Sequence, residues 1–135
     1  MEESDAPKRT KHIHVGAPAC FALEIAMQHV NLAFDSYGSY VVGSALERPD
    51  WRDVDIRMIM SDDAFAAEFP NASKGSWEFD SKWLLLTTAI SDWLRKQTGL
   101  PVDFQFQPQS HANQVHKKPR NAIGLRMTKA MDREE

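Results

Sequence analysis

The chain has 135 residues, 42% of them hydrophobic, and a formal net charge of −3 at pH 7. This length fits one domain with a buried core, and the slightly negative charge argues against general nucleic-acid binding. The sequence contains no apolar run near the roughly 18 residues of a membrane span and no secretory signal. The single cysteine, Cys20, excludes an internal disulfide and fits a reducing compartment, so we expect a cytoplasmic protein.

The first predicted elements are a flexible arm and a long helix. Residues 1–16 form the arm, in which acidic residues precede basic ones. The segment from Pro18 to Phe34 is predicted to be a helix, because its polar residues recur every three or four positions beside an apolar stripe. Proline suits the first helical turn, and Gly38 offers a left-handed cap where the helix should stop. We expect the apolar stripe to pack against a sheet.

Two strands are predicted next, over residues 39–43 and 53–60, with a Gly-Ser turn and a polar connection between them. In the second strand Asp53 and Asp55 alternate with apolar residues, so both carboxylates should project from one face. Two adjacent carboxylates repel each other, and a bound divalent cation commonly offsets this repulsion. The alternative is a solvent-facing strand that carries two aspartates by chance.

The following segments predict a second long helix and a third strand. Residues 61–63 should cap a short helix that ends at Pro70, and the long helix runs from Asp80 to Gln97. Its apolar side is wide, which indicates that it is covered on more than one side or contacts a partner. Residues 101–107 form the third strand, with Asp103 on its polar face. If the two aspartate-bearing strands are neighbours about 5 Å apart, their carboxylates form one cluster.

These elements predict an α/β (α+β) domain over residues 17–109, with a small mixed sheet covered by helices on one face. Residues 110–135 are predicted to be a basic C-terminal extension, which contains Lys117, Lys118, Arg120 and Arg126 and ends in a frayed helix. The basic side chains either form a solvated surface or fold over the acidic face of the sheet. In the second case they would neutralise a triphosphate or a nucleic acid.

The order of Val42-Gly43-Ser44, Asp53-Val54-Asp55 and Asp103, on these elements, resembles the polymerase-β-like nucleotidyltransferase superfamily. The resemblance is to its minimal single-domain members and spans about residues 18 to 107. It implies a nucleotidyltransferase-like fold and a metal-dependent transferase that moves a nucleoside monophosphate from an NTP, such as ATP, to a hydroxyl acceptor. Catalysis of this kind is mostly positioning and charge stabilisation.

The resemblance also implies a metal site. Asp53 and Asp55 would hold two Mg²⁺ or Mn²⁺ ions, and Asp103 would hold the catalytic one and help to deprotonate the acceptor hydroxyl. Without metal, we expect at least one of the three carboxyl groups to show a raised pKa, because like charges repel.

The nucleotide-binding residues implied or suggested by the sequence come from two segments. Gly43 would let the main chain approach the phosphates, and Ser44 would donate hydrogen bonds to a terminal phosphate. Lys117, Lys118 and Arg120 are the basic candidates for binding the same nucleotide.

Two other interpretations stay open. The chain could be a catalytically silent module of the same fold that binds nucleotide, nucleic acid or a partner protein, or an unrelated α/β domain whose acids occur by chance. The acceptor could be a protein, an RNA or a small molecule. The chain lacks the helical second domain on which larger family members bind their acceptor. Another copy of the chain, a partner protein or the basic C-terminal segment would therefore supply that surface.

Overall fold

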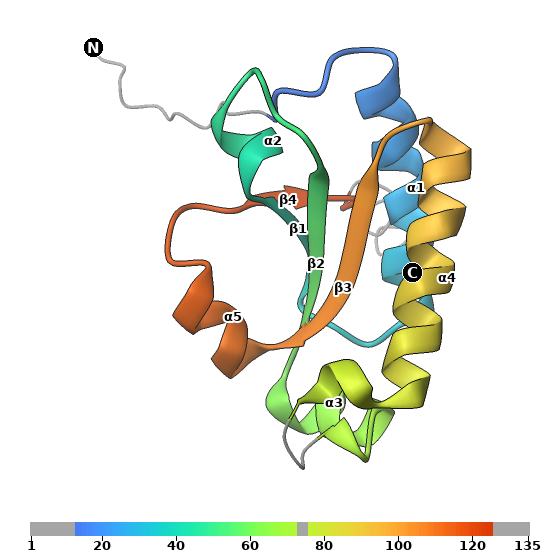
Figure 1. The fold of residues 1–135 in the computed structure, drawn as a ribbon, viewed down its shortest axis with the longest axis vertical. Helices are drawn as coiled ribbons and strands as arrows, with labels where there is room; N and C mark the ends of the chain where they lie inside the picture. Colours follow the sequence, from blue (N-terminus) through green and yellow to red (C-terminus); the bar gives the residue numbers. More distant parts are fainter. Residues whose placement is uncertain (1–12, 73–75, 126–135) are drawn as a thin grey trace, which may run out of the picture.

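A computed structural model describes residues 13–72 and 76–125 (Figure 1). The helices and strands follow in the order α1 (Ala19–Ala33), β1 (Gly38–Val42), α2 (Ser44–Glu47), β2 (Val54–Met60), α3 (Asp62–Glu68), the 3-10 helix η3 (Trp77–Phe79), α4 (Ser81–Thr98), β3 (Val102–Pro108), α5 (Gln109–Val115) and β4 (Asn121–Ile123). Most of the predicted arm, Arg126 and the predicted C-terminal helix lie outside the described residues.

The described strands form one mixed sheet in the order β3-β2-β1-β4, which confirms the predicted mixed sheet with helices. Strand β1 is antiparallel to both β2 and β4, whereas β2 and β3 are parallel and are joined through α3 and α4. The register of the parallel pair places Asp55 beside Asp103. The register of the β1–β2 pair places Val42 beside Asp55, so the end of β1 also lies at this position.

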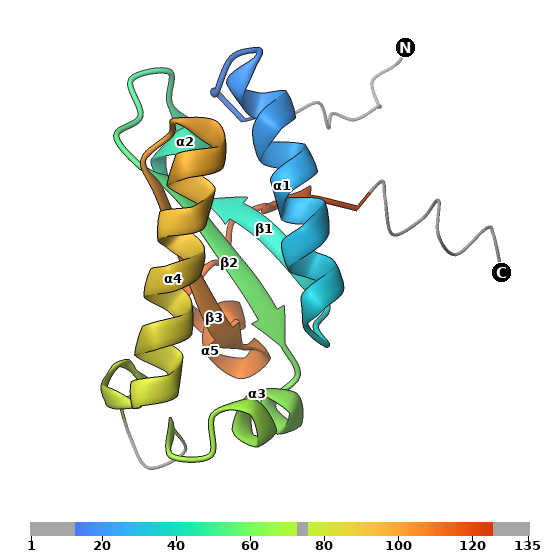
Figure 2. The same ribbon diagram turned by 90° about the vertical axis from the view of Figure 1, so that its right-hand side faces the viewer.

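Helices α1 and α4 lie next to each other on one face of the sheet, and α5 lies behind the sheet in the same view (Figure 2). The strands bury their apolar side chains under the two long helices; Ile56, Met58, Phe104 and Phe106 are fully buried. The opposite face carries the polar residues of β2 and β3. The one-sided strands predicted from the alternation are therefore confirmed.

Among the described residues, no helix is long and apolar enough to cross a membrane.

The free edge of β3 is closed by side chains of α4. The Ser91 hydroxyl accepts a hydrogen bond from the Phe104 N–H (2.9 Å) and lies 3.3 Å from the Phe104 carbonyl, to which it donates. Trp83 Nε1 donates to the Phe106 carbonyl at 3.0 Å. Because an edge strand exposes unpaired main-chain groups, these bonds keep β3 from pairing with another chain.

The C-terminal part of the described chain belongs to the same sheet, because β4 pairs with β1. The domain boundary predicted after residue 109 falls at the first residue of α5. The polar side of α1 holds the chain just after β4. Glu24 Oε2 accepts from the Gly124 N–H at 2.9 Å, and Asn31 Nδ2 donates to the Ile123 carbonyl at 2.9 Å. The polar stripe of this helix therefore binds a strand end as well as facing solvent.

The helix predicted over Pro18–Phe34 is confirmed within one residue at each end, but the glycine cap predicted for it was wrong. Helix α1 ends at Ala33, and Phe34 is extended, with its ring 5.0 Å from the ring of Phe106. Gly38, with φ of 121°, begins β1 and caps no helix. Packing of Phe34 into the core therefore stops the helix before the glycine is reached.

Candidate functional site

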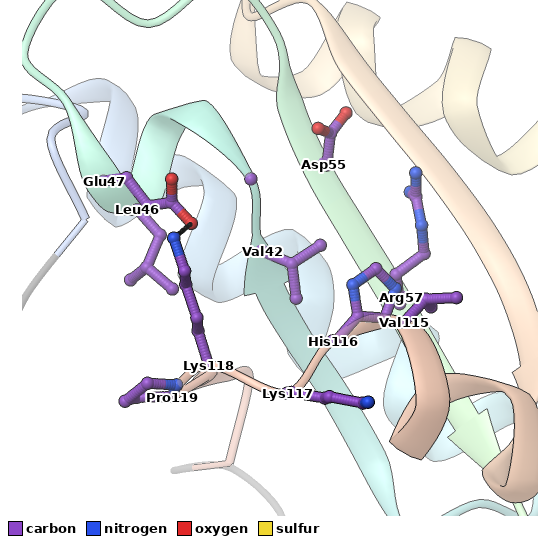
Figure 3. Close-up of a pocket in the computed structure, with 11 residues that line it drawn as sticks. Val42, Leu46, Glu47, Asp55, Arg57, Val115, His116, Lys117, Lys118 and Pro119 are labelled. Atoms are coloured by element: carbon purple, nitrogen blue, oxygen red, sulfur yellow. Dashed lines mark ion pairs between the residues drawn. The ribbon is translucent and has the colours of Figure 1, made fainter.

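A cavity of about 420 Å³ opens on the face of the sheet that lacks the long helices (Figure 3). Its walls come from the end of β1, α2, β2 and the connection between α5 and β4. Four of the residues predicted from the sequence line it: Gly43, Asp55, Lys117 and Lys118. Small-molecule sites have volumes of roughly 300–1,000 Å³, so the cavity is large enough for a ligand.

Gly43 and Asp55 are in close contact at one end of this cavity. Gly43 has φ of 76° and ψ of −152°, a conformation open only to glycine. A Cβ atom at this position would lie 2.5 Å from Asp55 Oδ2. The glycine was predicted to make room for phosphates, and the structure shows that it makes room for the Asp55 carboxylate.

Asp55 is half-buried, and its environment changes its acidity. Burial raises the pKa of this carboxyl above its ordinary value of 3.8, and Arg57 opposes the shift. The negative charges of Asp103 and Asp53 raise the pKa further. A raised carboxyl pKa was predicted for this cluster and is confirmed, although burial contributes more than repulsion.

Asp103 forms an ion pair with Arg57. The Arg57 Nη2 atom lies 3.2 Å from Asp103 Oδ2, and Nη1 donates to the Asp103 carbonyl at 2.7 Å. The arginine side chain is 10% exposed and that of the aspartate 42% exposed. Arg57 lies two residues after Asp55, so the alternation of the strand also places it on the polar face, but it was not among the predicted site residues. The signal was the same alternation that identified Asp55.

The carboxylates of Asp53, Asp55 and Asp103 are not arranged to coordinate a metal ion together. Across the described residues, no group of three or more His, Cys, Asp or Glu side chains is placed to hold an ion. Asp53 was expected inside the strand, but β2 begins at Val54, and Asp53 is exposed just before it. The carboxylate of Asp103 is already paired with Arg57.

The chemistry of the donors nevertheless suits a hard divalent cation. Mg²⁺ and Mn²⁺ prefer carboxylate oxygens completed by water and phosphate. Asp55 presents a half-buried carboxylate beside two further negative charges, which a cation would relieve. The donor chemistry of Asp53 and Asp55 therefore suits such an ion, whereas the carboxylate of Asp103 is held by Arg57.

Ser44 has a structural role in this arrangement. Its hydroxyl accepts a hydrogen bond from the Arg52 N–H at 3.3 Å and donates to the Asp53 carbonyl at 3.5 Å. These contacts hold the connection before β2 to the start of α2. Ser44 is not among the residues that line the cavity, so it acts on the site through the position of Asp53.

Arg120, the third predicted basic ligand, also lies outside the lining of the cavity. Its Nε donates to the His116 carbonyl at 3.1 Å, and Nη2 donates to the Ala112 carbonyl at 3.2 Å. Nη2 also donates to Asn113 Oδ1 at 2.9 Å. The Ala112 carbonyl also accepts from the His116 N–H at 2.9 Å, so Arg120 adds to the bonds of the last turn of α5 and holds the connection that carries the two lysines.

His116 lines the cavity, although it was not among the predicted site residues. Its Nε2 lies 3.2 Å from Gln107 Oε1, which joins the connection to the polar face of β3. Burial lowers the pKa of His116 below its ordinary value of 6.5, and the charges of Arg57, Arg120 and His111 lower it further. His116 therefore joins Arg57, Lys117 and Lys118 among the basic side chains that line the cavity.

No family model, curated protein or solved structure matches the chain. Its function is therefore inferred from the residues around the cavity.

Proposed function

We propose that this protein is a metal-dependent nucleotidyltransferase that moves a nucleoside monophosphate from an NTP to a hydroxyl group. The observation that carries the proposal is the cavity that Asp55, Lys117 and Lys118 line together (Figure 3). These residues are far apart in the sequence but line one space. An acidic side that suits a cation and a basic side that suits phosphates are the two requirements for binding a metal-bound triphosphate.

The acidic side would hold the metal. Asp53 and Asp55 would bind Mg²⁺ or Mn²⁺, which when bound neutralises the charge that develops on the phosphate oxygens. Gly43 keeps the Asp55 carboxylate at the edge of the cavity, because any side chain at this position would displace it.

The basic side would hold the triphosphate. Lys117 and Lys118 line the cavity from the connection after α5, and Lys118 reaches toward Glu47 (Figure 3). Lys118 Nζ lies 3.9 Å from Glu47 Oε2, with side chains 79% and 42% exposed. An exposed pair at this distance contributes little stability, so a phosphate can replace Glu47 as the partner of the lysine.

Asp103 would act on the acceptor. In the transfer, the acceptor hydroxyl oxygen bonds to the α-phosphorus, the bond to pyrophosphate breaks, and the hydroxyl proton passes to a base. Asp103 lies beside Asp55 in the adjacent strand, so its carboxylate can take the proton once Arg57 releases it. The acceptor would bind on this open side, against the C-terminal segment, a second copy or a partner protein.

A second candidate is a catalytically silent module with the same nucleotide-binding cavity. The Arg57–Asp103 ion pair favours it, because a carboxylate beside a guanidinium is a weak base and a poor metal ligand. In this case NTP and metal bind, and no transfer follows.

Calorimetry with a non-hydrolysable ATP analogue and Mg²⁺ tests the binding step. We expect binding that requires the metal and is lost in Asp55→Asn, whereas Asp92→Asn on α4, whose carboxylate pairs with Lys96, leaves it unchanged. Incubation with α-labelled NTPs and fractionated cell extract then tests transfer. Binding without transfer would select the silent module, and equal binding by both variants would remove the proposed site.

A further inference from the structure

Arg57 has one donor that the described residues do not satisfy. Nη1 donates to the carbonyls of Ile56 (3.1 Å) and Asp103 (2.7 Å), and Nη2 pairs with the Asp103 carboxylate. Nε is buried and has no hydrogen-bond partner among the described residues, although Arg57 lines the cavity. Arg57 as a whole is 9% exposed. Buried donors are almost always paired, and those of a charged group are costly to leave unpaired, so this N–H marks a place for an acceptor.

The same end of the cavity carries two further basic groups. His116 and Lys117 approach it from the connection after α5 (Figure 3). Burial lowers the pKa of His116, and the charge of Arg57 lowers it further. Arg57, His116 and Lys117 all line the cavity, so three basic side chains are available there to one ligand.

A phosphate group matches these three basic side chains better than a neutral ligand does. An oxyanion accepts a charge-assisted hydrogen bond from a guanidinium N–H and pairs with a lysine ammonium. It would also stabilise the protonated form of His116, whose ring then offers a second donor. Asp103 occupies the other nitrogens of Arg57 and holds the guanidinium in place for this contact.

We propose that Arg57, His116 and Lys117 form a phosphate-binding subsite, separate from the cation site of Asp53 and Asp55. The group bound is a phosphate, either of the nucleotide or of an acceptor that carries one. Which of these molecules carries the phosphate rests on the proposed function. The binding of phosphate itself does not rest on it, because binding requires neither metal nor transfer.

Titration of inorganic phosphate and pyrophosphate into the metal-free protein at low salt, followed by calorimetry and ³¹P NMR, tests the subsite. We expect Arg57→Gln and Lys117→Gln to weaken binding about tenfold or more, the effect of losing a hydrogen bond to a charged group. Arg57→Lys keeps the charge but not the Nε donor, and we expect the same loss if circular dichroism shows a native fold. Lys96→Gln, on α4 and 73% exposed, is the matched control and should bind like wild type.

Two results would overturn the subsite: no phosphate binding by the wild-type protein at low salt, or equal affinity in wild type and both Arg57 variants. A second titration, into protein saturated with an ATP analogue and Mg²⁺, identifies the source. Competition assigns the subsite to the phosphates of the nucleotide, and unchanged binding assigns it to a phosphorylated acceptor. If phosphate binding depends on Arg57 but no label is transferred, the subsite stands and the proposed transferase activity fails.

Discussion

Gly43 and Asp55 pack so closely that the absence of a side chain at one determines the position of the other. A Cβ on residue 43 would lie 2.5 Å from Asp55 Oδ2, and the φ of 76° at Gly43 excludes other residues without strain. The turn after β1 therefore places the carboxylate that faces the cavity.

Replacing this glycine should damage both the fold and the metal site. We expect Gly43→Ala to lower the free energy of unfolding by about 1–3 kcal/mol, from backbone strain. It should also abolish Mg²⁺ binding, because Asp55 must move. Urea denaturation and metal titration measure the two effects.

Gly99→Ala is the matched control, because Gly99 has φ of 74° but a Cβ there would have no heavy atom within 4 Å. It should lose about 1–2 kcal/mol and bind metal normally. Normal metal binding by Gly43→Ala would contradict the role of this contact.

The Asp103→Asn substitution separates transfer from binding. The amide keeps the size of the side chain but removes its charge, so we expect binding of the ATP analogue with Mg²⁺ to stay close to wild type. Turnover should fall about a hundredfold or more, because proton transfer acts mainly in the transition state. Transfer of label from α-labelled NTP measures it. Equal transfer rates in wild type and variant would exclude Asp103 from the mechanism.

The raised pKa of Asp55 predicts a pH dependence of stability. The folded state binds this proton more tightly than the unfolded state, whose pKa is near the ordinary value of 3.8. As the pH rises from that value through the raised pKa, the unfolded state loses its proton first, so the free energy of unfolding falls. We expect Asp55→Asn to be more stable than wild type at neutral pH, with the difference disappearing in acid. Urea denaturation at both pH values measures this. A variant less stable than wild type at neutral pH would contradict the sign.

The hydrogen bonds that close the edge of β3 can be tested in the same way. Ser91 is buried and pairs with both main-chain groups of Phe104. Ser91→Ala should cost about 1–3 kcal/mol, because these groups become buried without partners. Thr87 Oγ1 lies on the same helix and has no partner among the described residues. Thr87→Val should therefore leave the free energy of unfolding unchanged or raise it. If it lowered that free energy as much as Ser91→Ala does, the loss in Ser91→Ala could not be assigned to its hydrogen bonds with β3.

Local pattern in the sequence was sufficient for β1, β2, β3 and the two long helices, but not for β4. The alternation over residues 53–60 and 101–107 predicted which side chains face the core, and the structure confirms β2 and β3 within one residue. The spacing of apolar residues predicted α1 and α4 in the same way. Periodicity is a property of neighbouring residues, so it can be read without knowing what the segment packs against.

Contacts between distant segments were decided only by the tertiary structure. The sequence places Arg57 and Asp103 on polar faces, but their ion pair requires β2 and β3 to be parallel neighbours in this register. The same holds for the cavity, because Lys117 and Asp55 line one space only when the chain beyond β3 turns back and joins the sheet as β4. A long, flexible side chain can reach several partners, and the partner it finds depends on which strands pair and how they are aligned.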